Sequence, residues 1–416
     1  MKNMLKKILI VQHQNFINGS GGTEKICCFL ANELLSLGYE VEIATNENSI
    51  GQPVFHLDSK IKITNIYSDD INQKEIKPYV NYHGKNPFKW IKFKVKKKLA
   101  KLSNKKLMLS MGGFDNVYKF NLHQRSKLWN QFILSSKPDL IITMTIGSLL
   151  EITYEKEFNI PIVNSVNGRP DYDYTDQLWY RSKIDMKFLK ESYKHLSGIQ
   201  ILFNSYKDFL PGTFNGVCKV IPNPVPQLNE VINHSQSKDR YRIINMASLV
   251  LDCKQQDLAL KVFAEIAEEY PNWDLFFWGE GNGLNKLEEL IEDYKLQNRV
   301  FLKGFTETPL EELKSSDIFI FPSKYEGFPL ALTEAMSVGL PSLGFESCSG
   351  VNELIKHNKT GFLAKNTEEM KNYLEKLMID SKLRQDFGIN AQKDMSVYTS
   401  EYVKGEWNQM IKEVLG

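Results

Sequence analysis

Ser323-Lys-Tyr-Glu-Gly-Phe-Pro-Leu-Ala-Leu-Thr-Glu-Ala-Met336 is the segment of this chain that most constrains its structure. The apolar run Asp317-Ile-Phe-Ile-Phe321 before it predicts a short buried strand. The residues from Pro329 onward predict a helix, because proline is tolerated in a first helical turn. The N–H groups of Phe328 and Leu330 and the positive end of the helix dipole then face the intervening loop. This arrangement favours binding of a phosphate or a polarised hydroxyl group there.

Two glutamates, Glu326 and Glu334, lie on either side of this turn, eight positions apart. At a rise of about 1.5 Å per helical residue, their carboxylates are on the order of 10 Å apart. That separation is too large for a shared proton but suits the two ends of one extended ligand, such as the sugar and the ribose of a nucleotide sugar. The alternative is structural, because the helix dipole alone favours glutamate in the first turns.

Length and composition indicate a folded chain of two domains. The chain has 416 residues, 42% of them hydrophobic and 25% charged, which suits two domains of roughly 200 residues each. The N-terminal residues predict a first strand rather than a signal peptide, and no stretch approaches the ~18 apolar residues of a membrane span. An odd number of cysteines without metal-ligand spacing predicts a reducing, cytoplasmic compartment; they are Cys27, Cys28, Cys218, Cys253 and Cys348.

Apolar strands alternate with helical patterns in both halves of the chain, which predicts parallel sheets with crossover helices. The predicted strands are 7–11, 39–44, 140–144, 162–166 and 199–203, then 241–246, 275–278, 300–302, 318–321 and 342–345. Three prolines in Ile221-Pro-Asn-Pro-Val-Pro226 predict a stiff connector between the two halves. A last amphipathic helix is expected over residues 401–414.

The order Glu-Gly-Phe-Pro-Leu, Glu-Ala-Met, then Gly-Leu-Pro341 and a strand resembles the signature of the retaining GT-B glycosyltransferases of family 4, the group 1 glycosyl transferases. The resemblance covers nearly the whole chain in the order of its motifs, and its specificity is concentrated between Val300 and Leu363. It implies an α/β protein of GT-B fold, with two Rossmann-like domains facing across a cleft. The implied parts are an acceptor domain over 1–222, a nucleotide-sugar domain over 223–398, and a helix over 399–416 that crosses back to the first domain.

The resemblance also implies roles for individual residues. Glu326 is the implied catalytic residue, either as a nucleophile or by positioning the donor sugar. Glu334 would bind the ribose, and Lys254, at the start of a predicted helix, would hold the diphosphate with the helix dipole. The complete set of expected donor-binding residues is Gly21, Gly22, Ser248, Lys254, Gly304, Phe305, Gly327, Phe328, Pro329, Leu330 and Glu334.

The glycine-rich segment Gly19-Ser-Gly-Gly-Thr-Glu24 follows the first strand and opens the first helix. It is not a dinucleotide fingerprint, because Glu24 stands where that motif needs its third glycine. Its Gly-Gly-x-Glu form is similar to the first-loop motif of the glycosyltransferase family, which meets the donor phosphate or the acceptor. An ordinary glycine turn is the alternative.

Two positions depart from the family pattern. Ser248 stands where the family commonly has an arginine that neutralises the diphosphate, so more of that task would rest on Lys254 and backbone dipoles. Asn167 stands where the family often has a histidine near the reactive carbon of the sugar. Asparagine can hydrogen-bond a sugar hydroxyl but cannot act as a base, so it is either a contact to the acceptor or sugar or a turn residue before Gly168.

Asp171-Tyr-Asp173 imitates the D-x-D metal motif of the other large glycosyltransferase fold. It lies in a polar loop, and enzymes of the GT-B type generally need no metal, so no metal site is expected. The loop is instead expected to rim the acceptor cleft with Trp179 and Tyr180.

A lysine-rich segment spans residues 85–107. Phe88, Ile91, Val95, Leu99 and Leu102 recur at helical spacing among ten lysines, and no acidic residue occurs from 76 to 114. The pattern predicts a basic amphipathic helix on an anionic membrane surface. Four of its lysines are expected at the membrane: Lys94, Lys96, Lys97 and Lys98. The alternative is an apolar stripe packed on the domain with solvated lysines; nucleic acid is not an expected partner, because no aromatic platform accompanies the charge.

The sequence therefore predicts a retaining hexosyltransferase that serves surface-polysaccharide or glycolipid synthesis in the cell envelope. It would use a UDP- or GDP-linked sugar and a glycan or lipid-linked acceptor, with no cofactor and no metal. It would work in the cytoplasm, peripherally on the inner face of the membrane. The alternatives are a non-catalytic subunit that binds a sugar nucleotide or a lipid carrier, and a nucleotide-sugar epimerase of the same fold.

Overall fold

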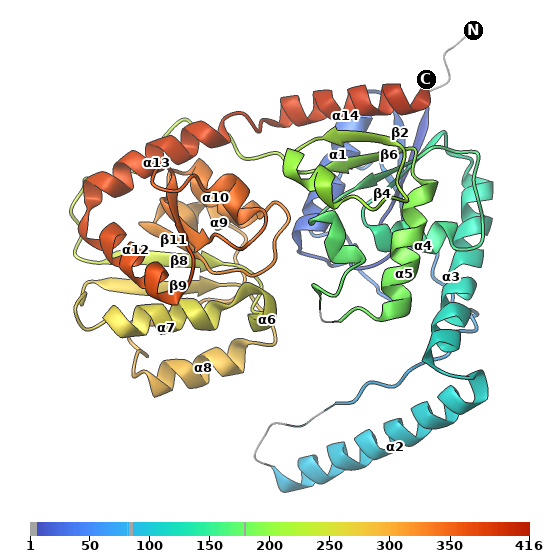
Figure 1. Ribbon diagram of the computed structural model, residues 1–416, viewed down its shortest axis with the longest axis horizontal. Helices are drawn as coiled ribbons and strands as arrows, with labels where there is room; N and C mark the ends of the chain where they lie inside the picture. Colours follow the sequence, from blue (N-terminus) through green and yellow to red (C-terminus); the bar gives the residue numbers. More distant parts are fainter. Residues whose placement is uncertain (1–5, 81, 83–85, 179) are drawn as a thin grey trace.

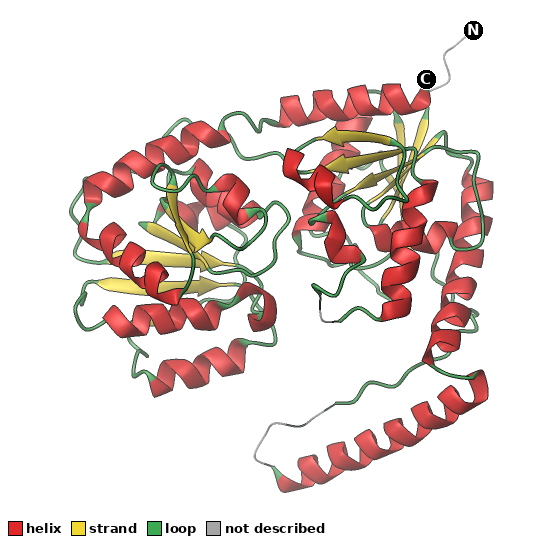
Figure 2. Cartoon of the chain, in the orientation of Figure 1, coloured by secondary structure: helices red, strands yellow, loops and turns green. Residues whose placement is uncertain are grey.

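The computed structural model describes residues 6–80, 82, 86–178 and 180–416. The chain forms two parallel α/β sheets side by side, each covered by helices on both faces (Figures 1 and 2). The connector 221–226, with its three prolines, runs from the first sheet to the second, and the predicted domain limit at 222/223 falls within it.

The first sheet has seven described strands, all paired in parallel, in the order β3-β2-β1-β4-β5-β6-β7. These strands are β1 (Lys7–Val11), β2 (Glu40–Thr45), β3 (Lys62–Asn65), β4 (Leu140–Thr143), β5 (Ile162–Ser165), β6 (Gly198–Ile201) and β7 (Val217–Val220). The helices of this half are α1 (Gly22–Ser36), α2 (Pro87–Met111), α3 (Phe114–Ser136), α4 (Ile146–Thr153) and α5 (Lys183–Ser192), with short 3₁₀ helices η1 (Pro170–Asp173), η2 (Tyr193–His195) and η3 (Asn204–Phe209).

The second sheet has the order β10-β9-β8-β11-β12-β13, again with parallel pairing. Its strands are β8 (Tyr241–Met246), β9 (Trp273–Trp278), β10 (Val300–Leu302), β11 (Ile318–Phe321), β12 (Ser342–Phe345) and β13 (Gly361–Ala364). Its helices are α6 (Leu251–Lys254), α7 (Gln256–Ile266), α8 (Leu284–Asp293), α9 (Pro309–Lys314), α10 (Leu330–Ser337), α11 (Val351–Leu354), α12 (Thr367–Ile379) and α13 (Ser381–Met395).

The last helix, α14 (Ser400–Leu415), returns to the first half and packs along α1 (Figure 1). Its apolar face is buried in the same core as β1 and α1, and it consists of Val403, Trp407, Met410 and Ile411. The chain therefore crosses between the two sheets twice, at 221–226 and at 396–399. The predicted parallel α/β architecture and the returning helix are confirmed.

The three strands that the sequence did not predict are β3, β7 and β13. All three lie at the edges of their sheets, and β3 and β7 are only partly buried. An edge strand is covered less completely than a central one and therefore shows a weaker apolar pattern.

Two local predictions were wrong. Lys254 does not begin a helix: it ends the short helix α6, and Gln255 at φ +51° separates α6 from α7. Helix α10 begins at Leu330 rather than at Pro329, because Pro329 adopts an extended conformation (φ −65°, ψ 105°) just before the helix. The proline thus directs the chain from the loop into α10.

In both sheets the strand order reverses once, between β1 and β4 in the first and between β8 and β11 in the second. Loops that leave the carboxyl ends of strands on either side of such a reversal diverge, and the crevice between them is where open α/β sheets bind ligands. The segments singled out in the sequence follow β1, β5, β8, β10 and β11.

Candidate active site

The loop after β11 in the second domain lies directly against the first domain. A Cβ atom placed on Gly327 would lie 2.1 Å from the backbone oxygen of Asn167, which follows β5 in the first domain. Only glycine fits this approach. The predicted donor loop and Asn167 are therefore in direct contact.

Lys254 and Glu326 meet at the point where the second sheet reverses. Lys254 is carried by α6 after β8, and Glu326 lies in the loop after β11; the Lys254 Nζ atom is 2.6 Å from Glu326 Oε1. Their side chains are 21% and 9% exposed, respectively. Burial alone would lower the pKa of Lys254, but the Glu326 carboxylate outweighs it and the pKa lies above its ordinary value. The lysine therefore stays charged at neutral pH.

Glu334 is paired with a lysine that the sequence analysis did not single out. Its side chain is 8% exposed, and Oε1 accepts a hydrogen bond from Nζ of Lys25 in α1 of the first domain. The two glutamates of the donor segment are thus each neutralised by a different lysine, which agrees with two separate binding points rather than a shared proton. The only local signal for Lys25 was its place directly after the Gly-Gly-x-Glu motif.

The glycine-rich first loop lies against the start of α10. A Cβ on Gly22 would be 3.4 Å from Leu330 Cδ1, and Gly21 is the residue just before α1. Glu24 points back into the first domain, where Oε1 accepts a hydrogen bond of 2.7 Å from Gln12 Nε2. Burial raises the pKa of Glu24. Within this motif, Gly22 therefore faces the second domain, and Glu24 is held inside the first domain.

Ser248, Gly304 and Phe305 lie at the same edge of the second sheet, after β8 and β10. The backbone oxygen of Ser248 accepts a hydrogen bond of 2.9 Å from Gln256, and the Gly279 N–H donates to Gly304 O at 2.7 Å. Phe305 is 55% exposed. These strand-end loops extend the candidate site along the rim of the second domain, away from Glu326.

One end of the Asn167 side-chain amide already makes a hydrogen bond within the first domain. Its Nδ2 donates to the backbone oxygen of Met144 at the end of β4. That bond leaves the amide oxygen, an acceptor, as the atom better placed to meet a sugar hydroxyl.

The Asp171-Tyr-Asp173 segment forms the 3₁₀ helix η1, and arginines hold both of its aspartates. Arg169 binds Asp171 through two hydrogen bonds of 2.6 and 2.9 Å, and Arg181 pairs with Asp173. Across the part of the chain that the structure describes, no group of three or more His, Cys, Asp or Glu side chains is arranged to hold a metal ion. Trp179, the expected neighbour in the acceptor rim, lies outside the described residues.

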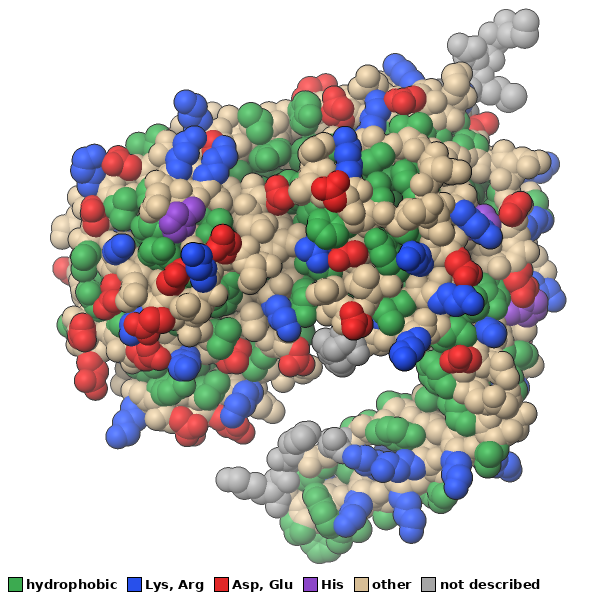
Figure 3. Space-filling view, viewed as in Figure 1, with side chains coloured by type: hydrophobic (Ala, Val, Ile, Leu, Met, Phe, Trp, Pro, Cys, Tyr) green, Lys and Arg blue, Asp and Glu red, His purple; other side chains and the backbone are tan. Residues whose placement is uncertain are grey.

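The lysine-rich segment forms α2, which projects from α3 away from both sheets (Figure 1). Its apolar stripe does not pack on the domain: Phe88, Ile91, Val95, Leu99 and Leu102 are all more than half exposed. Figure 3 shows lysine and apolar side chains side by side along this arm. Lys94 Nζ lies 4.4 Å from the ring centre of Trp90. Lys85 is outside the described residues.

The extended residues before α2 are fixed by two asparagines. Asn104 of α2 bonds both the N–H and the C=O of Lys77, and Asn121 of α3 does the same for Lys74. These four hydrogen bonds fix the extended residues to α2 and α3. No helix among the described residues is long and apolar enough to cross a membrane.

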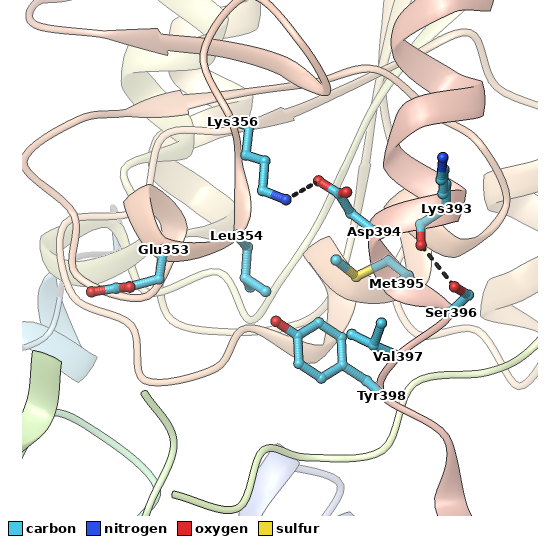
Figure 4. Close-up of a pocket in the computed structure, with 9 residues that line it drawn as sticks. All are labelled: Glu353, Leu354, Lys356, Lys393, Asp394, Met395, Ser396, Val397 and Tyr398. Atoms are coloured by element: carbon cyan, nitrogen blue, oxygen red, sulfur yellow. Dashed lines mark hydrogen bonds and ion pairs between the residues drawn. The ribbon is translucent and has the colours of Figure 1, made fainter. Parts of the chain in front are cut away.

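Two cavities lie beside the second chain crossing rather than at the donor loop. One, of about 330 Å³, lies between residues 353–356 and 393–398, and an ion pair of 2.7 Å between Lys356 and Asp394 lines it (Figure 4). The other, of about 500 Å³, lies between residues 202–204 and the two connectors. Val397 and Tyr398 line both cavities. Both cavities therefore lie at the second chain crossing.

Comparison with known proteins agrees with this geometry. Residues 229–394 match the family model described as glycosyl transferases group 1. An uncharacterised glycosyltransferase of Haemophilus influenzae is 25% identical over 95% of this chain and 97% of its own length. The poly(ribitol-phosphate) α-N-acetylglucosaminyltransferase of Staphylococcus aureus is 26% identical over 70% of this chain, but only 58% of its own length is matched.

The fold is also that of a solved structure. S. aureus TarM, crystallised as a variant in complex with UDP, fondaparinux and α-GlcNAc-glycerol, matches with a TM-score of 0.71 and 16% identity, over 98% of this chain and 99% of that protein. The likeness confirms the GT-B fold that the sequence predicted.

Removing one member of the Lys254–Glu326 pair should destabilise the protein. Lys254→Met leaves a mostly buried carboxylate without its partner, which we expect to cost on the order of 3 kcal/mol in the free energy of unfolding, measured with denaturant. The double variant Lys254→Met with Glu326→Gln should recover at least half of that loss. If the two substitutions simply add, the pair has no coupling and this description of the site is wrong.

Proposed function

The chain belongs to the group 1 glycosyl transferases and is a glycosyltransferase. On that premise we propose that it transfers the sugar of a UDP-linked donor to a glycan or lipid-linked acceptor, with retention at the anomeric carbon. One observation carries the proposal: Lys254 Nζ and Glu326 Oε1 lie 2.6 Å apart where the donor loop meets the first domain. A cation for the departing phosphate and a carboxylate for the sugar are needed on the two sides of one bond.

The reaction follows from these two charges. Lys254 stabilises the negative charge that develops on the departing diphosphate as the bond from the anomeric carbon to the phosphate oxygen breaks. The acceptor oxygen bonds to the same face of that carbon, and its proton passes to the departing phosphate oxygen. Asn167 assists by accepting a hydrogen bond from a sugar hydroxyl. No separate base is required.

Glu326 acts by positioning the sugar rather than as a nucleophile. Its carboxylate is already neutralised by Lys254 at 2.6 Å, and a charge-paired carboxylate is a weaker nucleophile than a free one. Oriented hydroxyl groups and a fixed leaving group supply the catalysis through proximity and charge. Contact between the two domains limits the water that could hydrolyse the donor.

We infer that donor binding replaces the Lys25–Glu334 ion pair, at the end of the site away from Glu326, with hydrogen bonds to the ribose. Glu334 exchanges Lys25 for the ribose hydroxyls, and Lys25 is released toward the diphosphate. The exchange keeps the buried carboxylate satisfied in both states, which avoids the penalty of an unpaired buried charge. Gly304 and Phe305 lie near the base, and Ser248 near the diphosphate.

UDP is the proposed donor nucleotide because the TarM structure that shares this fold contains UDP. The proposed acceptor is a surface polymer or its lipid-linked precursor, since one relative acts on poly(ribitol phosphate). Two alternatives, a non-catalytic binding subunit and an epimerase, are less well supported, because Glu326 and Glu334 are both present and each has its own lysine. Donor turnover without an acceptor, followed by product analysis, separates the three.

We further propose that α2 binds an anionic membrane from the cytoplasmic side. Its exposed apolar stripe and acid-free lysine surface match a helix that lies in the interface plane. Each lysine near an anionic surface contributes about 1 kcal/mol. Docking by this arm would keep the two-domain body beside a lipid-linked acceptor.

Substitution of Glu326 and of Glu334 by alanine should affect different steps, transfer in the first case and UDP binding in the second. Glu326→Ala is expected to lower kcat on the order of 10²–10³-fold with little change in UDP affinity, because it acts on the sugar. Glu334→Ala is expected to weaken UDP binding roughly 10- to 100-fold, because it removes charged hydrogen bonds to the ribose. Steady-state transfer rates and calorimetric titration with UDP measure the two effects. Near-normal turnover of Glu326→Ala would contradict the role proposed for Glu326 in transfer.

UDP should stabilise the protein more than GDP does. A ligand at about 100 times its Kd adds about 2.7 kcal/mol, which for domains of this size raises Tm by about 5–10 °C. A thermal-shift series with UDP, GDP, ADP and their sugars measures this. A larger shift with GDP would replace the donor proposed here.

The lysines of α2 should control binding to anionic vesicles. Substituting Lys94, Lys96, Lys97 and Lys98 with Ser removes about 4 kcal/mol of attraction and should release the protein from phosphatidylglycerol vesicles in a sedimentation assay. The matched control changes four exposed lysines elsewhere to Ser: Lys187, Lys286, Lys314 and Lys382. Vesicle binding that survives the α2 variant, or that is lost equally in the control, removes the membrane proposal.

A further inference from the structure

A single tyrosine hydroxyl of the first domain holds two loops of the second domain. Tyr206 lies in η3 after β6 and is 1% exposed. Its hydroxyl donates a hydrogen bond of 2.8 Å to the backbone oxygen of Gly327 and accepts one of 3.1 Å from Ser349 Oγ. Gly327 directly follows Glu326, so this contact reaches within one residue of the proposed catalytic carboxylate.

The surrounding contacts leave the loop little freedom. Phe328 stacks on Phe203 of the first domain, with ring centres 5.4 Å apart, and meets the edge of Tyr398 at 5.5 Å. Tyr398 belongs to the second chain crossing, and its backbone oxygen accepts a hydrogen bond of 2.8 Å from the N–H of Val225 in the first crossing. The donor loop is therefore packed against the first domain and against the second connector, which is itself hydrogen-bonded to the first.

The Tyr206 hydroxyl is suited to donate at any physiological pH. Burial raises its pKa well above the ordinary value, so the proton stays on the oxygen. Without that hydrogen bond, the carbonyl of the buried Gly327 would lose its donor, and an unpaired buried carbonyl is unfavourable.

We propose that Tyr206 is a positioning residue for Glu326: through the Gly327 carbonyl it fixes the donor loop in the place where the carboxylate meets the sugar. The inference rests on the proposed function for the identity of the reaction, but the contact itself does not. Because the Tyr206 hydroxyl contacts Gly327 and Ser349, and none of the residues proposed to bind the base, the ribose or the diphosphate, transfer depends on this contact while UDP binding does not. Transfer of the sugar therefore requires that the two domains are in contact.

Tyr206→Phe tests the proposal, because it removes the hydroxyl and keeps the ring. We expect kcat to fall on the order of tenfold, as for loss of one hydrogen bond to a buried carbonyl, with UDP affinity within about twofold of wild type. The matched control is Tyr118→Phe, which removes a 2.6 Å hydrogen bond to Asp185 inside the first domain. The control should leave kcat unchanged. An unchanged kcat in Tyr206→Phe, or an equal loss in the control, overturns the proposal.

A second variant separates the contact from the reaction. Ser349→Ala removes the other hydroxyl, and its effect on the thermal unfolding midpoint should not add to that of Tyr206→Phe, since both act through one hydrogen-bonded group. This cycle needs no donor, so additive midpoints reject the contact even if the proposed function is right. Coupled midpoints without any transfer activity would leave the contact in place and reject the function instead. Should Tyr206→Phe not fold, Ser349→Ala alone must lower kcat at unchanged UDP affinity, and a failure to do so overturns the proposal.

Discussion

The approach of the donor loop to the first domain, where Gly327 lies against the Asn167 backbone, is the constraint on which the site depends. It sets the Lys254–Glu326 pair at the junction of the two domains and brings Glu334 within reach of Lys25. Without that approach each domain would hold half of a site. A transferase needs such an arrangement, because donor and acceptor must meet in a place that water does not fill.

The parts of the site within one segment were predictable from the sequence, and the parts that join the domains were not. Glu326, the glycine turn and the start of α10 follow from local patterns, apart from the one-residue shift at Pro329. The pairing of Lys25 with Glu334 spans 309 positions, and that of Tyr206 with Gly327 spans 121. Neither pairing can be predicted from strand or helix periodicity, because each depends on how the two folded domains contact each other.

The fold itself was largely determined by periodicity and connector chemistry. The central strands β8, β11 and β12 and the edge strand β10 were predicted at their observed limits, because they carry continuous apolar runs between clear breaks. The edge strands β3 and β7 and the α6–α7 junction were not predicted, because partial burial of the strands and the positive φ of Gln255 leave weaker patterns. The character of α2 was visible in its lysines, but its exposure required the structure.

The most direct test is hydrogen–deuterium exchange of the wild-type protein with and without UDP. The account predicts that UDP slows exchange in three segments together: residues 21–26 of the first domain, 248–256, and 326–336. These segments hold Lys25, Lys254, Glu326 and Glu334, which the nucleotide and the domain contact should both protect. Protection confined to other regions, or no change at saturating UDP, would contradict the placement of the donor at this junction.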